Sequence, residues 1–164
     1  MNSKEKGNRF ERYIAKLLSK ELFGSDNLLF WRSASSGALG AVSHVDKLYG
    51  DIVSIDARGN KLTDKCVIEL KSYKSLDLLT LFSSSSIFWK WWKQVLKEAE
   101  ESKRIPVLIF KLNYRGIYFV FSYSDVKRFL NDFKFFRVIC DYDVVIVQEK
   151  NGLKVLRALI EGYK

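Results

Sequence analysis

The stretch KCVIELKSYK, residues 65–74, has the composition of a buried β-strand but carries charge in its middle. Apolar residues fill most of it, while Glu69 and Lys71 stand two positions apart. Because side chains alternate between the two faces of a strand, Glu69 and Lys71 share one face with Val67, and the positions between them point to the other face. The pattern predicts a carboxylate and an ammonium group side by side on a rigid strand.

A second acidic residue precedes this strand. Asp51 begins the apolar stretch of residues 51–55, and the short ARGN turn that follows predicts an antiparallel hairpin with residues 65–74. Asp51 would then reach the same end of the sheet as Glu69. Two carboxylates can hold Mg²⁺ together with phosphate oxygens and water, and a nearby lysine can orient the attacking water or stabilise charge on the phosphate. This chemistry is phosphodiester hydrolysis. The alternative is a plain ion pair, because edge strands often carry charge.

The rest of the chain shows helical and strand periodicities in mixed order, which favours an α/β domain. The helix that separates the strand at 65–74 from the next strand is typical of a crossover unit. A short helix is expected to begin at Ser124 or Asp125. Asn151-Gly152 allows either a hairpin turn or the start of a terminal helix. Helices are expected over 3–22, 87–103 and 124–132, and further strands over 27–33, 105–112 and 116–122, with two more in the tail.

Composition favours one globular domain that binds a polyanion. The chain has 164 residues, 48% of them hydrophobic, and a formal net charge of +9. That charge favours nucleic acid, although an anionic membrane surface would satisfy it too. No apolar run approaches the about 20 residues of a membrane span, and the charged N-terminus has no secretory signal. We therefore expect a cytoplasmic protein without a membrane partner, in the host cytoplasm if it is viral. Cys66 and Cys140 are expected to be buried thiols.

Residues 87–101 combine three tryptophans with lysines. They could stack on the bases of single-stranded nucleic acid. Trp89, Trp92, Leu96 and Ala99 follow helical spacing, however, so the stripe is expected in the core.

Five landmarks in this order and near these separations resemble the archaeal-type Holliday-junction resolvases of the PD-(D/E)XK nuclease superfamily. The likeness covers about residues 4–130, and residues 131–164 have no clear counterpart. Gly50 stands where the superfamily motif has proline. The landmarks are KGNRFERYIAKLL (6–18), RSASSGA (32–38), GDIVSID (50–56), VIELKS (67–72) and KQVLKEAEESKRIPVLIFK (93–111).

The resemblance implies a restriction-endonuclease-like mixed central β-sheet flanked by helices, forming a single nuclease domain over 1–164 with 131–164 as a C-terminal extension. Asp51 and Glu69 would be metal ligands and Lys71 the catalytic lysine. Glu11 would match an additional active-site glutamate that helps to hold the metal, and Ser36 the serine of a loop near the scissile phosphate. Gln94, on the helix expected over 87–103, could reach the active site, because a glutamine or lysine on this helix does so in some members of the superfamily. The cofactor would be Mg²⁺, with Mn²⁺ able to substitute.

The partner implied by the resemblance is branched double-stranded DNA, cut symmetrically by a C2 homodimer. Apolar residues between positions 76 and 82 are available for the dimer interface. The alternatives are a nuclease of the superfamily with another DNA substrate, or a DNA-binding module without turnover. A surface that binds phosphates would include Lys4, Lys6, Arg9, Arg12, Arg32 and Ser35, unless these residues only form a solvated basic face.

Overall fold

The structure is a computed structural model, and it describes residues 3–33, 49–77, 80–81, 83–131 and 133–162. Its centre is a five-stranded sheet with the strand order β3-β4-β5-β7-β6. β3 and β4 are parallel, and every other neighbouring pair is antiparallel. The strands are β3 (Cys66–Tyr73), β4 (Ile105–Leu112), β5 (Gly116–Ser122), β6 (Phe136–Ile139) and β7 (Asp143–Gln148).

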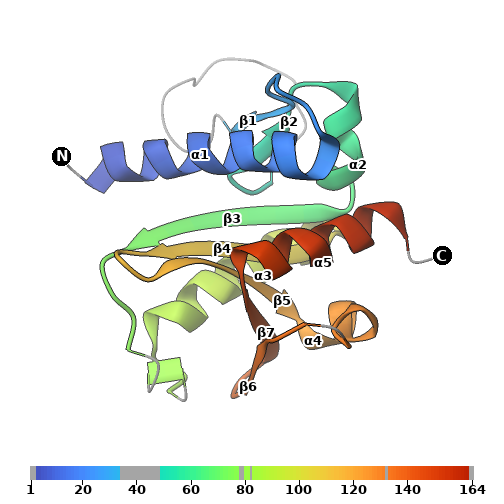
Figure 1. The fold of residues 1–164 in the computed structure, drawn as a ribbon. Coiled ribbons are helices and arrows are strands. Elements are labelled where there is room, and N and C mark those ends of the chain that lie inside the picture. Colours follow the sequence, from blue (N-terminus) through green and yellow to red (C-terminus); the bar gives the residue numbers. More distant parts are fainter. Residues whose placement is uncertain (1–2, 34–48, 78–79, 82, 132, 163–164) are drawn as a thin grey trace.

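Helices cover both faces of this sheet, which confirms the predicted α/β class and the mixed sheet flanked by helices (Figure 1). α1 (Ser3–Phe23) and α5 (Glu149–Glu161) share one buried core with strand residues such as Ile68 and Ile109. α3 (Ile87–Ser102) packs on the opposite face, in a second core that includes Val67 and Leu108. The alternation of strand side chains thus separates two hydrophobic cores.

The predicted crossover is confirmed, because α3 connects β3 to β4 and these two strands are parallel. β4 and β5, both predicted as strands, form an antiparallel pair through residues 113–115, where Tyr114 has a positive φ of 61°. In the predicted core stripe of α3, Trp89, Trp92 and Ala99 are buried and Leu96 is partly buried, so the two tryptophans are not available to stack on bases.

Residues 133–162 contribute two strands to the sheet and a helix that packs on it. β7 lies between β5 and β6, and α5 packs against β5 and β7. The helix begins at Glu149, which decides the alternative left open at Asn151-Gly152 in favour of a helix. α5 approaches β5 so closely that a Cβ atom at Gly152 would overlap the ring of Phe119. A glycine is therefore required at this crossing.

The hairpin predicted between residues 51–55 and 65–74 is wrong. β2 (Ile52–Ser54) pairs antiparallel with β1 (Phe30–Arg32) in a separate two-stranded sheet. The intervening segment forms a 3₁₀ turn, η2 (Ala57–Gly59), and a short helix, α2 (Asn60–Thr63), instead of a tight turn. The side chain of Asp56 caps the turn by accepting a hydrogen bond from Arg58 N at 2.9 Å.

Two smaller expectations also change. The short helix α4 (Tyr123–Val126) starts one or two residues before the predicted position and continues as a 3₁₀ turn, η4 (Lys127–Phe129). Cys66 is buried as expected, whereas Cys140 is only partly buried. Among the described helices, none is both long enough and apolar enough to cross a membrane.

Candidate active site

Asp51 is held against the free edge of β3 by its backbone and its side chain. Its N–H donates to Ile68 O at 2.8 Å, and its Oδ2 accepts from Leu70 N–H at 2.8 Å. The chain reaches Asp51 through Gly50, whose φ is +73°. A Cβ atom at Gly50 would lie 2.7 Å from Ile68 O, and proline cannot adopt a positive φ. The glycine that replaces the proline of the superfamily motif is therefore required by this close approach.

Glu69 and Lys71 lie on the α3 face of β3, as their spacing predicted. Lys71 Nζ donates to Glu69 Oε1 at 2.5 Å and to Gln94 Oε1 of α3 at 3.1 Å. The Glu69 side chain is only 4% exposed, compared with 26% for Lys71. Gln94 thus reaches the site, which the sequence had allowed but not required. The lysine is held between two acceptors from different elements.

The carboxylates of this cluster resist losing their protons. Burial, together with the neighbouring charge of Asp51, raises the pKa of Glu69 to about 7, although Lys71 opposes the shift. Burial also raises the pKa of Asp51, against the hydrogen bond from Leu70 N–H and the charge of Lys71. Two acidic groups confined in this way gain from a cation between them, because it would offset both desolvation and repulsion.

Glu11 of α1 lies close enough to Asp51 and Lys71 to interact with their charges. Burial and the charge of Asp51 raise its pKa, while Arg32, Arg12 and Lys71 lower it. Its Oε2 is buried without a hydrogen-bond partner among the described residues, and Arg32 Nη1 lies 3.7 Å away. Buried oxygens usually have a partner, so this atom has room for a further positive ligand.

Asp51 and Glu69 supply carboxylate oxygens of the kind that hold a divalent metal ion. Within the described residues no group of three acidic, histidine or cysteine side chains is close enough to enclose a metal alone, so the three-carboxylate set of Asp51, Glu69 and Glu11 is not assembled as one cage. Mg²⁺ does not need such a cage, because one or two carboxylates with substrate phosphates and water complete its coordination. The unpartnered Glu11 oxygen and the raised carboxyl pKa values are consistent with such an ion.

Glu98 is a site residue that the sequence analysis did not single out. Its Oε2 accepts from Gly50 N–H at 2.6 Å, and its charge adds to the raised pKa of Asp51 and of Glu69. Its position four residues after Gln94 on α3 was the available signal, since both then share one helix face. Asn8 of α1 is a second residue that the sequence analysis did not single out; its Oδ1 accepts a hydrogen bond from Arg32 Nη1 at 2.6 Å.

The predicted phosphate-binding residues divide into three groups. Arg32 is tied to Asn8 and Glu11, and Arg12 lies close enough to Glu11 to lower its pKa. Lys6 and Arg9 line a groove of about 290 Å³ beside the site. The side chain of Lys4 and the loop residues Ser35 and Ser36 lie outside the described part of the chain.

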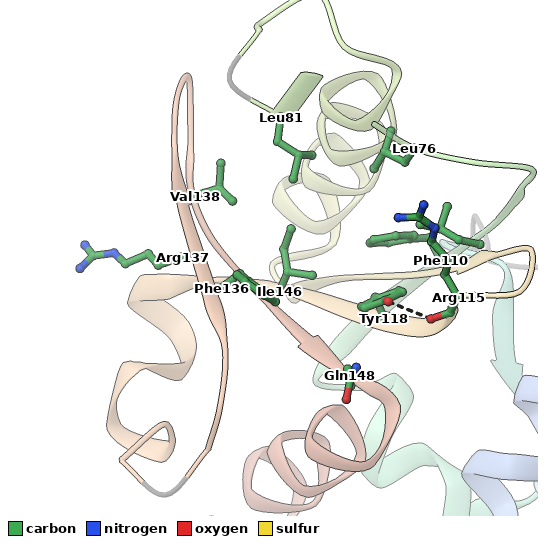
Figure 2. Close-up of a pocket in the computed structure, with 11 residues that line it drawn as sticks. Leu76, Leu81, Phe110, Arg115, Tyr118, Phe136, Arg137, Val138, Ile146 and Gln148 are labelled. Atoms are coloured by element: carbon green, nitrogen blue, oxygen red, sulfur yellow. Dashed lines mark hydrogen bonds between the residues drawn. The ribbon is translucent and has the colours of Figure 1, made fainter. Parts of the chain in front are cut away.

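A second hollow, of about 390 Å³, is lined by residues of the α3-side core and of β6 (Figure 2). None of the proposed catalytic residues that the structure describes is among its lining residues. Its lining is largely apolar and, among the described residues, contains no acidic side chain; Phe110 stacks on Tyr118, and Phe136 and Val138 come from β6.

Leu76 and Leu81, expected to be available for a dimer interface, are buried in the α3-side core of the same chain. That expectation is wrong for these two residues; Leu78, Leu79 and Phe82 lie outside the described residues.

Comparison with known proteins identifies the family. The solved structure of Archaeoglobus fulgidus Hjc, a Holliday junction resolvase from an archaeal hyperthermophile, is 19% identical, covers 88% of this chain and 85% of its own, and has a TM-score of 0.39. No curated protein sequence matches the chain. The model of the family described as "Phage putative PDDEXK endonuclease" matches residues 2–163, which include β6, β7 and α5. This match confirms the superfamily inferred from the motifs, and the chain belongs to this family of PDDEXK endonucleases.

Proposed function

We propose that the protein is a Mg²⁺-dependent endonuclease that resolves four-way DNA junctions by paired, symmetric phosphodiester cleavage. The observation that carries the nuclease activity is the convergence of Asp51, Glu69 and Lys71 at the edge of β3, with Glu69 buried and its pKa raised. A protein that only binds DNA has no use for buried carboxylates that repel phosphate. The net charge of +9 supports a polyanionic substrate.

Each residue of the cluster has a distinct task in this proposal. Asp51 and Glu69 would hold the metal ion, with help from Glu11; when bound, the ion supplies Lewis-acid polarisation of the phosphate and a more acidic water. Lys71 Nζ orients the attacking water and stabilises the negative charge that develops on the phosphate. Gln94 holds the ammonium group in place from α3, and Glu98 holds the Gly50 peptide that leads into Asp51.

The four-way junction is the finer part of the proposal. It is supported by the five landmarks that resemble the archaeal-type resolvases. Symmetric cuts require two active sites that face two strands, which implies a C2 homodimer. Mn²⁺ is expected to substitute for Mg²⁺, since both are bound by carboxylate and water oxygens.

The test is cleavage of labelled DNA by the purified full-length protein. A four-way junction and a linear duplex of matching sequence are each incubated with Mg²⁺ or with EDTA. The Asp51→Asn variant removes one proposed metal ligand, and Asp26→Asn, at an exposed carboxylate, is the matched control. Paired symmetric nicks in the junction alone, lost with EDTA and in Asp51→Asn but not in Asp26→Asn, support the proposal.

Other results would support one of the two alternative functions. Equal cutting of junction and duplex would replace the resolvase by a nuclease of the same family with broader specificity. Tight binding of both DNAs without cleavage by either Mg²⁺ or Mn²⁺ would identify a DNA-binding module that lacks turnover.

A further inference from the structure

The groove of about 290 Å³ beside the candidate active site is lined by residues from one helix and two strands. α1 contributes Lys6, Arg9, Phe10 and Tyr13, and the carboxyl ends of β3 and β4 contribute Ser72, Lys111 and Asn113. Ser72 and Lys111 are register partners in the parallel pair. They lie on the α1 face, because Leu70 and Ile109, two positions earlier in each strand, belong to the core on that side.

The groove is strongly basic and, among the described residues, has no acidic lining side chain. Lys6, Arg9 and Lys111 supply three positive charges, and none of them forms an ion pair with another residue of the described chain. Three cations gathered without a carboxylate repel one another, so an anion in the groove would be stabilised. The Ser72 hydroxyl and the Asn113 amide add uncharged hydrogen-bond donors. This combination suits a phosphodiester, which offers one negative charge and several acceptor oxygens.

The size and position of the groove indicate which phosphodiester it takes. Its volume is at the small end of ligand pockets, which start at about 300 Å³, so it suits one backbone unit rather than a whole duplex. Ser72 follows Lys71 directly, and Phe10 precedes Glu11. Neighbouring strand residues point to opposite faces, so Ser72 and the groove lie on the α1 face, the side from which Glu11 comes, whereas Lys71 lies on the α3 face. A DNA strand bound at Asp51 and Glu11 at the edge of β3 would pass the mouth of this groove on the α1 side.

We propose that this groove is a second phosphate-binding subsite, which holds a backbone phosphate of the DNA strand next to the one that is cleaved, with Lys111 as a principal cation. The inference rests on the proposed nuclease function and adds Lys111, Ser72 and Asn113 to the DNA-binding surface. Within the described chain Lys111 forms no ion pair with a carboxylate, and its side chain is exposed on β4. Substitution of Lys111 is therefore compatible with folding.

The first test measures DNA binding apart from cleavage. Fluorescence anisotropy of a labelled junction is recorded in EDTA between 50 and 200 mM salt, for the wild type, Lys111→Ala and the matched control Lys127→Ala at an exposed lysine of η4. Loss of one phosphate contact lowers the slope of log affinity against log salt by about 0.9, so the wild type should lose about threefold more affinity over this range than Lys111→Ala. Lys127→Ala should match the wild type.

The second test locates the phosphate. Single phosphates near the cut are replaced in turn by uncharged methylphosphonates. One position beside the cleaved phosphate should weaken binding by the wild type and have no further effect in Lys111→Ala. If every position weakens both proteins equally, or if Lys111→Ala keeps the wild-type salt slope, the subsite is wrong.

Failure of the subsite and failure of the nuclease proposal give different results. A wild type that cleaves DNA while Lys111→Ala retains its full salt slope overturns only the subsite. A wild type that binds DNA but never cleaves it overturns the nuclease, and the salt slope still decides whether the groove binds a phosphate.

Discussion

The Gly50 N–H donates to Glu98 Oε2 at 2.6 Å, so a carboxylate on the crossover helix α3 holds the peptide group between Tyr49 and Gly50, one residue before Asp51. Asp51 is then tied to β3 through Ile68 and Leu70. The position of the proposed metal ligand therefore depends on two elements, β3 and α3, that follow it in the sequence. Substitution of a residue that holds a metal ligand in place, without binding the metal itself, commonly lowers metal affinity or activity by about 10- to 100-fold.

Substitution of Glu98 by alanine should lower the cleavage rate by about 10- to 100-fold, because the Gly50 N–H loses its acceptor and Asp51 loses its support. Glu98→Gln keeps an acceptor oxygen and should restore most of the rate. It should also move the pH profile to lower pH, because the charge that raises the pKa of Asp51 and Glu69 is gone. The measurement is the single-turnover rate against pH, with Glu100→Ala on the same helix as the control. Equal loss in the alanine and glutamine variants would contradict a positioning role.

Lys71 should be needed for turnover but not for DNA binding. Lys71→Ala removes the proposed charge stabilisation and should reduce cleavage about 10²- to 10³-fold, as loss of one preorganised donor does elsewhere. Gln94→Ala should have a smaller effect, since Glu69 still holds the ammonium group. Cleavage rates and DNA affinity are measured together, with Lys90→Ala as the exposed control. A Lys71→Ala protein that cuts at the wild-type rate would remove Lys71 from the mechanism.

The metal-free protein should lose stability between about pH 4.5 and pH 7. The pKa of Glu69 is raised to about 7 in the folded state from its ordinary value of 4.5, so the folded state holds a proton that the unfolded state releases. The stabilisation from that proton is complete below the unfolded pKa and disappears as pH rises through the folded pKa. Thermal unfolding in EDTA should thus show a lower Tm at pH 8 than at pH 5, and Glu69→Gln should reduce the difference. An unchanged difference in Glu69→Gln would exclude Glu69 as its source.

Added Mg²⁺ should act in the opposite direction. A ligand that binds only the folded state raises its stability, and binding requires the ionised carboxylates. The rise in Tm on addition of Mg²⁺ should therefore be larger at pH 8 than at pH 5.5, and it should be absent in Asp51→Asn. A rise that is independent of pH, or that persists in Asp51→Asn, would place the ion elsewhere.

Alanine at Gly50 should be unusually destabilising. A left-handed conformation costs a non-glycine residue about 1–2 kcal/mol, and at Gly50 the added Cβ would also lie 2.7 Å from Ile68 O. Gly24 provides the matched control, because it has a similar φ of 61° but no described atom within 4 Å of an added Cβ. Denaturant unfolding of Gly50→Ala and Gly24→Ala compares strain with and without the overlap. Equal losses would show that the approach of Gly50 to β3 is not rigid.

Local periodicity determined much of the fold and half of the site. The helices α1 and α3 and the strands β3, β4 and β5 were recognised because a side-chain period of 3.6 or 2 is a property of neighbouring residues. For the same reason the spacing of Glu69 and Lys71 was enough to assign both to one face of β3. The helical spacing of Trp89 and Trp92 likewise identified them as core.

Only the tertiary structure decided which other residues lie next to Glu69 and Lys71. The path from Asp51 to β3 was mispredicted as a hairpin, because the Asp56 cap and the pairing of β2 with β1 depend on residues that a turn motif does not include. Glu98 and Asn8 were missed because their partners, Gly50 and Arg32, are distant in sequence. The sequence by itself determined the chemical groups and the strand that presents two of them. The folded chain decided which distant groups meet at the β3 edge, because burial and packing between elements, not local spacing, bring Asp51, Glu11 and α3 to it.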